Sequence, residues 1–417
     1  MAKPRGHIAI VLHCHLPYVR HPEHEDFLEE DWFYEAVAET YVPLLLMLRR
    51  LEADGVPGKL TVSFSPTLCE MATNELLVRR CRRYLEERLE LAEKETRRTK
   101  GSAFAETARL YRRRYGEARR VLQELGPDGL PGGFAELARR GRIELIGTAA
   151  THALLPLLET RTSRWAQMSE GLANFGKYFD GRPDGFWLPE CAYSPGLDEL
   201  LAQFGFRYCF MDTHGVLLAE PAPPFGVFAP LETPSGILAL GRDVESSRQV
   251  WSADEGYPGH PVYREFYRDL GFDADLEYLR PYVHSDGERR YLGLKYHRVT
   301  GDVPLDQKRP YDPVAARSQA HRHAEQFVRA RRSQVARVHR ATGIEPLLVA
   351  PYDAELFGHW WFEGLWFLEK VLRLAAEADD LVCTRPSAYL AGGVGHEQAG
   401  RPALSSWGQG GYFEPWE

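Results

Sequence analysis

The sequence predicts an α/β fold in which a mostly parallel sheet closes into a barrel. Short apolar runs recur between helical stretches, at residues 8–12, 60–64, 143–146, 185–188, 208–211, 237–240, 292–294, 347–350 and 381–383. Strands that alternate with helices usually form parallel sheets. Most of these runs end in polar or aromatic residues, which is typical of barrels whose active site lies at the carboxyl ends of the strands.

The segments between these runs differ in character. A helix is expected from about Trp32 to Asp54, with Gly55 as its stop. Residues 75–140 carry Arg, Glu and Leu at helical spacing, which predicts a helical insertion with solvated faces. Residues 242–286 are rich in Tyr, Gly, Pro and Asp without clear periodicity, and predict an inserted loop or lid. The barrel itself is then expected from residues 1–74 and 141–400.

The composition restricts the class of protein. The chain has 417 residues, a net charge of -8 and 44% hydrophobic residues, as in ordinary globular proteins. The negative charge argues against nucleic acid as the main partner and favours a neutral polymer or small molecule. No apolar run approaches the ~18 residues of a membrane helix. Abundant arginine and only two asparagines fit either a heat-adapted source or a GC-rich genome.

The cysteines and the amino terminus predict the compartment. The six cysteines show no paired metal-site spacing and are sparse for a disulfide-rich secreted protein, so reduced thiols are expected. The apolar run after the basic start is too short for a signal peptide. Together these observations predict a cytoplasmic protein.

Two carboxylates follow predicted strands. Asp353 comes after the apolar run 346–350, and Glu190 comes after the run 185–188. Retaining cleavage of a glycosidic bond needs two carboxyl groups about 5 to 5.5 Å apart, and a closed barrel can bring such distant positions together. Each residue alone would more simply be a surface or ion-paired carboxylate. Their shared position at strand ends, beside aromatic residues, favours a catalytic pair.

Three histidines also follow predicted strands. His13 and His15 form an H-x-H step, so their side chains point the same way, as metal ligands do. They could equally donate to sugar hydroxyls, and without a third ligand at a telling spacing we favour hydroxyl binding and predict no metal. His152 is as easily a structural histidine as a substrate contact.

Aromatic residues are the third signal. Pyranose rings present apolar C–H faces that stack on tryptophan, although core packing is the default for any single aromatic residue. The candidates for a cleft are Trp32, Trp187, Trp251, Tyr257, Trp360, Trp361, Trp407 and Trp416. Trp407 precedes the glycine-rich stretch 408–411 and is the least suited to a core. The chain lacks a dinucleotide fingerprint, a phosphate-binding loop and a serine nucleophile elbow.

Together these segments resemble glycoside hydrolase family 57, most closely its 1,4-α-glucan branching members. The resemblance runs through residues 13–17, 151–152, 187–193, 353–361 and 406–408. It implies a (β/α)7 barrel, no cofactor, and α-1,4-glucan such as amylose or glycogen as substrate. It also implies a retaining mechanism with Glu190 as nucleophile and Asp353 as general acid/base.

The resemblance implies further contacts. Trp32, Trp407 and Trp416 would line the cleft, with residues 401–417 starting a carboxyl-terminal segment along it. An arginine within 263–269 would touch substrate, and we prefer Arg268. The loop 242–286 would carry a tyrosine over the site, with Tyr257 as the candidate. Family members usually continue into a helical carboxyl-terminal domain, whereas this sequence stops at Glu417. Either the chain is trimmed or the protein is a short form, and in a short form acceptor binding and branching would be in doubt.

Other functions stay open at this point. An α-amylase or a 4-α-glucanotransferase would use the same two carboxylates. A metal-dependent polysaccharide deacetylase would use His13 and His15 as ligands. A glucan-binding protein without activity would have no need of both Glu190 and Asp353.

Overall fold

The computed structural model describes residues 5–252, 255–393 and 398–417. A parallel sheet runs through its centre in the order β7-β5-β4-β3-β2-β1-β8. The strands along this path are β7 (Leu238–Gly241), β5 (Tyr208–Met211), β4 (Gly185–Trp187), β3 (Ile143–Thr148), β2 (Leu60–Phe64), β1 (His7–Cys14) and β8 (Leu347–Asp353). β6 (Leu231–Glu232) pairs antiparallel with β7, β10 (Gln398–Ala399) pairs with β6, and β9 (Val382–Cys383) pairs with β1.

The sheet curls until its two ends meet. Directly after β7, Arg242 forms a parallel bridge with Val349 of β8. The backbone N–H of Asp243 donates to the carbonyl of Val349 at 2.8 Å. Seven parallel strands of the described chain therefore form a closed ring, which confirms the predicted α/β barrel.

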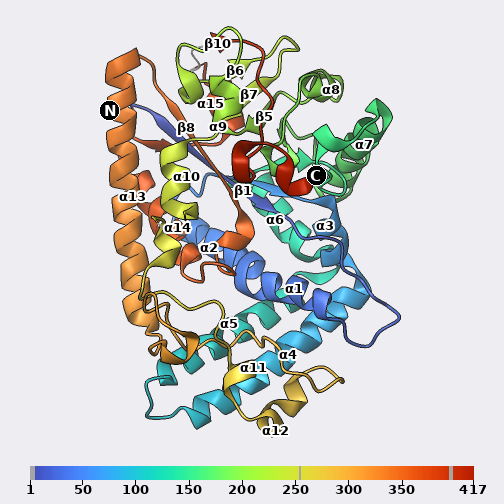
Figure 1. The fold of residues 1–417 in the computed structure, drawn as a ribbon, viewed down its shortest axis with the longest axis vertical. Helices are drawn as coiled ribbons and strands as arrows, with labels where there is room; N and C mark the ends of the chain where they lie inside the picture. Colours follow the sequence, from blue (N-terminus) through green and yellow to red (C-terminus); the bar gives the residue numbers. More distant parts are fainter. Residues whose placement is uncertain (1–4, 253–254, 394–397) are drawn as a thin grey trace.

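Helices surround this ring (Figure 1). In chain order they are α1 (Leu28–Ala36), α2 (Val42–Ala53), α3 (Pro66–Thr73), α4 (Glu75–Arg98), α5 (Ala105–Glu124), α6 (Gly129–Arg139), α7 (Arg161–Tyr178), α8 (Leu197–Gln203), α9 (Thr213–Leu217), α10 (Val244–Trp251), α11 (Leu270–Asp273), α12 (Leu276–Leu279), α13 (Pro313–Thr342), α14 (Gly364–Glu377) and α15 (Pro386–Ala391). The helix expected from Trp32 to Asp54 is α1 and α2, joined by a π-helical turn, Val37–Tyr41.

Local chemistry sets the ends of the two longest helices. Asn74 caps α4 by accepting from the backbone N–H groups of Leu76 and Leu77. Asp312 caps α13 in the same way, Pro313 occupies the first turn, and Gly343 ends the helix at φ +76°. α13 forms one long edge of the molecule in Figure 1.

Residues 75–140 contain the helices α4, α5 and α6. α4 and α5 pack against each other as a hairpin at one end of the molecule, whereas α6 packs on α2, α3 and β3 beside the barrel (Figure 1). Residues 242–286 include α10, α11 and α12 as well as irregular chain. The later part packs on α4: the guanidinium of Arg88 donates to the carbonyl of Tyr282.

One predicted strand is wrong. Leu292 and Leu294 are fully buried, but residues 292–294 form no strand. Their backbone N–H groups are used by a side chain instead: Asp269 accepts from Leu292 and Gly293. A short apolar run shows that a segment is buried and does not distinguish a strand from a buried loop.

Two apolar layers flank the strands. Alternate residues such as Ala9, Val11, Trp187 and Val349 fill the interior of the barrel, and the opposite faces of the strands pack against the helices. Because side chains alternate along a strand, His13 of β1 lies on the interior face with Ala9 and Val11. In the described part of the chain, no helix combines the length and the apolar character needed to span a membrane.

Candidate active site

The carboxyl ends of β1 and β8 place two predicted site residues side by side. The strands are parallel neighbours, and His13 is the register partner of Asp353. Register partners on neighbouring strands point to the same face of the sheet, so Asp353 lies with His13 at the interior mouth of the barrel.

Glu190 lies at the end of β4 in an unusual backbone conformation. Glu190 and Cys191 have φ angles of +58° and +49°, and His152 has φ +55°. Left-handed backbone is uncommon for such residues and costs about 1 to 3 kcal/mol, so the surroundings must hold it in place. Non-glycine residues in this region often belong to functional sites.

Four hydrogen bonds hold Glu190. The His152 Nε2 lies 2.8 Å from Oε1 of its carboxylate, and the indole N–H of Trp407 donates to Oε2 at 2.8 Å. The backbone N–H of Trp407 and the hydroxyl of Ser406 donate to the Glu190 carbonyl, each at 3.1 Å. Both carboxylate oxygens therefore have a partner, and the carboxylate is 25% exposed as a side chain.

The segment 401–417 reaches the site from the far end of the chain. It pairs with Tyr193 through a bridge at Ser405, and its last residues lie beside the barrel strands (Figure 1). Trp416 packs over Gly408, where a Cβ atom would lie 2.3 Å from the indole ring. Because Gly408 has no side chain, Trp416 can lie against the backbone next to Trp407. Trp416 is 38% exposed.

The two carboxyl groups have opposite pKa shifts. Burial tends to raise the pKa of Glu190, but the hydrogen bonds from His152 and Trp407 bring it below its ordinary value. Burial raises the pKa of Asp353 well above its ordinary value, and the charges of Glu355 and Glu190 raise it further. These opposite shifts favour an ionised carboxylate at Glu190 and a protonated carboxyl group at Asp353, which is the division that acid-assisted nucleophilic attack requires.

Glu355 is a site residue that the sequence reasoning missed. It is 7% exposed and accepts from the Tyr41 hydroxyl at 2.5 Å and from the His15 backbone N–H at 3.1 Å. Burial raises its pKa to about 7, against those hydrogen bonds. The signal was present in the sequence: Glu355 is two residues after Asp353, in the 3-10 turn Ala354–Leu356 that follows β8.

His13 does not contact solvent, contrary to the prediction that it binds sugar hydroxyls. Its side chain is buried, 1% exposed, and its ring stacks on Trp187 with centroids 4.7 Å apart. Its Nε2 lies 3.1 Å from Nδ1 of His152. His13 therefore reaches a substrate only through His152. His15 and His152 are half-buried.

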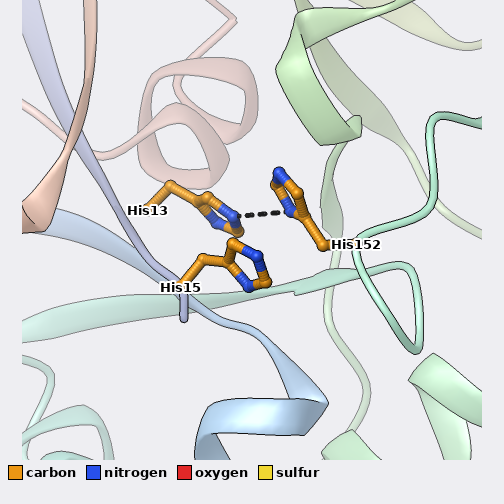
Figure 2. A group of neighbouring side chains, drawn as sticks. All are labelled: His13, His15 and His152. Carbon is orange, nitrogen blue, oxygen red and sulfur yellow. Dashed lines mark hydrogen bonds between the residues drawn. The ribbon is translucent and has the colours of Figure 1, made fainter. Parts of the chain in front are cut away.

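These three histidines form a compact cluster (Figure 2). One nitrogen from each of His13, His15 and His152 lies within 4.8 Å of the others, so the third ligand that the sequence did not reveal is His152. However, the rings are within 17° to 19° of parallel, and the rings of His15 and His152 stack at 3.9 Å. A metal lies in the plane of each imidazole that binds it, so these rings would have to turn before one ion could bind all three.

A cavity of about 380 Å³ opens beside Trp407. Its wall includes Trp251, at the end of α10, and Arg242, whose guanidinium lies 5.4 Å from the Trp407 ring. Arg242 is ion-paired with Asp212 at 3.0 Å, and Trp251 is 37% exposed. Tryptophan faces beside fixed polar groups are suited to neutral sugar rings.

The other tryptophans expected in the cleft fall into an exposed group and a buried group. Trp32 on α1 is 48% exposed, and Trp360 is 54% exposed and stacks on Phe266 at 4.6 Å. Trp187 and Trp361 are buried core residues, so the prediction that they face a cleft is wrong.

Tyr257 does not lie over the carboxylates, contrary to its prediction. It is 6% exposed and packs between His323, with ring centroids 4.4 Å apart, and Phe367, at 5.5 Å. Tyr257 therefore fills a pocket between α13 and α14. The glycine- and proline-rich sequence around it gave no sign of this burial.

The preferred arginine also has another role. Arg268 pairs with Asp273 at 2.9 Å and donates to the carbonyl of Leu305. The nearby Arg264 is the one that approaches the Asp353 loop: it donates to the His359 carbonyl and pairs with the buried Glu39 at 2.7 Å. His359 Nδ1 lies 2.9 Å from the other oxygen of Glu39.

The fold is a closed α/β barrel with two carboxyl groups at its mouth, and sequence comparison identifies the family. The model of glycosyl hydrolase family 57 matches residues 9–351. This chain belongs to that family.

Three relatives show the range within it. The chain is 32% identical over 397 residues to a 1,4-alpha-glucan branching enzyme of Thermococcus kodakarensis, covering 89% of this chain and 55% of that protein. It is 42% identical to the alpha-amylase AmyC of Thermotoga maritima, with a TM-score of 0.92 over 97% of this chain and 78% of that one. A branching enzyme of Pyrococcus horikoshii is 32% identical, with a TM-score of 0.87 over 99% and 75%.

Proposed function

We propose that this chain is a retaining α-glucan transglycosylase that cleaves α-1,4 bonds and forms α-1,6 branches in glycogen-type glucan. The observation that carries the proposal is the position of Glu190 and Asp353 at one barrel mouth, with the Glu190 carboxylate held by His152 and Trp407. The opposite directions of their pKa shifts agree with it. The similarity to two branching enzymes supports the substrate. This chain spans 55% of the length of the T. kodakarensis branching enzyme.

In the proposed mechanism, Glu190 attacks C1 of an α-1,4-linked glucosyl unit. Protonated Asp353 gives its proton to the departing 4-oxygen, and a covalent glycosyl-enzyme forms on Glu190. Asp353, now a carboxylate, then removes a proton from the acceptor hydroxyl while the acceptor oxygen attacks C1 and the Glu190 carboxylate is released. A glucan 6-hydroxyl gives a branch, a 4-hydroxyl gives disproportionation, and water gives hydrolysis.

The surroundings support this division of roles. His152 and Trp407 donate to the Glu190 carboxylate and keep it ionised before attack. Burial and Glu355 favour the protonated form of Asp353. The cavity between Trp407 and Trp251 offers a place for a neighbouring glucosyl ring.

Hydrolysis is the second candidate, and a specific observation favours it. The solved structure with 42% identity and a TM-score of 0.92 is described as an alpha-amylase. Both candidates share the glycosyl-enzyme and differ in what resolves it, so the products distinguish them.

The deciding experiment incubates the purified chain with amylose. Branching predicts linkages that a debranching enzyme cleaves, and an α-1,6 anomeric proton signal by NMR, with little gain in reducing ends. If new reducing ends appear without α-1,6 bonds, the chain hydrolyses glucan and the branching proposal is wrong. Glu190→Gln and Asp353→Asn serve as matched controls, and conversion at the wild-type rate in either would refute the site.

We place the reaction in the cytoplasm and in glycogen synthesis. All six cysteines are free and buried, which supports a reducing compartment. Fractionation of the source cells, with glycogen branch analysis after loss of the gene, tests both assignments.

A further inference from the structure

His13 is linked to the nucleophile without reaching the surface. A chain of two contacts connects them: His13 Nε2 to His152 Nδ1 at 3.1 Å, and His152 Nε2 to Glu190 Oε1 at 2.8 Å. Figure 2 shows the first of these contacts, with His13 and His152 facing each other and His15 beside both. His13 is too deeply buried to touch a substrate.

The hydrogen-bond partners determine where the protons are. A neutral imidazole has one N–H and one lone pair. Burial lowers the pKa of His13 well below its ordinary value, so the ring is neutral. Its Nδ1 is buried without a hydrogen-bond partner. A proton there would leave an unpaired buried donor, which is more costly than an unpaired lone pair, so the proton of His13 belongs on Nε2.

The state of His152 then follows. His13 Nε2–H donates to Nδ1 of His152, which must present its lone pair. The single proton of His152 therefore lies on Nε2, where it donates to Glu190. In the opposite tautomer, Nε2 would present a lone pair to the carboxylate and repel it.

We propose that His13 is a positioning residue, whose Nε2–H fixes His152 in the tautomer that donates to the nucleophile Glu190. The assignment of Glu190 as nucleophile rests on the proposed function; the tautomer of His152 does not. His15 contributes packing, since its ring stacks on His152 at 3.9 Å.

Few charged groups surround His152 and Glu190. Glu190 faces His152 from the loop after β3 and Trp407 from the carboxyl-terminal segment. Across the site, the charge of Glu190 acts on Asp353 of β8, which also senses Glu355 and Arg242.

The first test is spectroscopic and independent of any reaction. In protein labelled with ¹⁵N-histidine, long-range proton–nitrogen spectra distinguish the two tautomers, and a His152→Gln variant assigns the signal. The proposal predicts the Nε2–H form of His152 in the wild type and loss of that single form in His13→Leu. An Nδ1–H form or an imidazolium in the wild type would overturn it.

The second test is kinetic and uses a matched pair of variants. His13→Gln keeps an N–H near the position of Nε2, whereas His13→Leu removes it. For His13→Leu we expect the acid limb of kcat/KM to move up by about one pH unit, with kcat about tenfold lower and KM nearly unchanged. His13→Gln should restore much of both, and an acid limb that stays in place in a folded His13→Leu refutes the role.

The two tests separate the possible failures. If the chain cleaves no glucan, the proposed function fails while the spectra still decide the tautomer. If glucan is cleaved and the tautomer is wrong, only the role of His13 fails. Should His13→Leu not fold, the wild-type spectrum and the profile of His13→Gln decide, since the latter must retain the wild-type acid limb.

Discussion

Trp407 binds Glu190 twice, through its indole N–H to the carboxylate at 2.8 Å and through its backbone N–H to the carbonyl at 3.1 Å. The first bond favours the ionised carboxylate, and the second fixes the left-handed backbone that carries it. The same tryptophan also forms one wall of the neighbouring cavity. The charge of the Glu190 carboxylate, the conformation of its backbone and one wall of the cavity therefore depend on one residue.

Trp407→Phe should raise the pKa of Glu190 and slow the reaction. Phenylalanine keeps an aromatic wall but removes a hydrogen bond to a charged group, worth about 1.5 to 3 kcal/mol. We expect the acid limb of the pH–rate profile to shift upward and kcat to fall about 10- to 100-fold. Trp251→Phe is the control, since it retains the bond to Glu190. An equal effect in both variants would assign the loss to the cavity wall.

Glu355→Gln should move the basic limb of the profile to lower pH. The charge of Glu355 helps to raise the pKa of Asp353, and its own pKa of about 7 means that it is mostly ionised above that pH. Removing the charge lets Asp353 lose its proton earlier, by about one pH unit. The measurement is kcat against pH, with Glu106→Gln as control, since the Glu106 side chain is 62% exposed. A basic limb that remains in place would exclude this coupling.

Arg264→Met should destabilise the fold strongly. The ion pair of Arg264 with Glu39 is buried, with side-chain exposures of 1% and 7%. Breaking a buried pair leaves an uncompensated charge and costs about 3 to 5 kcal/mol. Equilibrium unfolding in urea measures this loss. Arg120→Met, which breaks an exposed pair with Glu124, should cost no more than ~0.5 kcal/mol, and similar losses in both would contradict the prediction.

Gly408→Ala should displace Trp416 and weaken glucan binding. The added methyl group would lie 2.3 Å from the Trp416 ring, so the ring must move. We expect a several-fold higher KM for amylose with a small change in kcat. Gly176→Ala on α7, where a Cβ meets nothing within 4 Å, is the matched control. Unchanged binding of maltooligosaccharides, followed by tryptophan fluorescence, would remove Trp416 from the cleft.

Dialysis against EDTA should leave glucan conversion unchanged. The three imidazoles of the cluster are nearly parallel, and His152 is already hydrogen-bonded through both nitrogens. Metal analysis of the purified protein provides the second readout. A stoichiometric transition metal, with activity lost on chelation and restored on addition, would reopen the deacetylase alternative.

The sequence was sufficient to predict the barrel because strand and helix signals are local. Most apolar runs became strands, and the residues that follow them lie at the barrel mouth, as for His13 and Asp353. The run 292–294 forms no strand, and the backbone N–H groups of Leu292 and Gly293 bond to the Asp269 side chain, which no local pattern connects to the run. The roles of Glu190 and Asp353 stay predictions that the kinetic experiments test.

The details of the site depend on contacts between distant residues. The bond from Trp407 to Glu190 spans 217 positions, and Tyr257 is buried by helices that follow it in the chain. Neither distance nor burial can be read from the spacing of residues. Glu355, by contrast, lies in the same motif as Asp353, residues 353–361. It was missed because the retaining mechanism needs only one carboxyl group from that motif.

The position of Trp407 in the chain sets an order of events during synthesis. The ribosome makes all strands of the closed ring before it reaches residue 407, so the ring can form while Glu190 still lacks its indole partner. A nascent chain at that stage would have a folded barrel in which Glu190 lacks the hydrogen bond from Trp407. Under the proposed function, the site is complete only once residue 407 has been made, after the barrel that surrounds it.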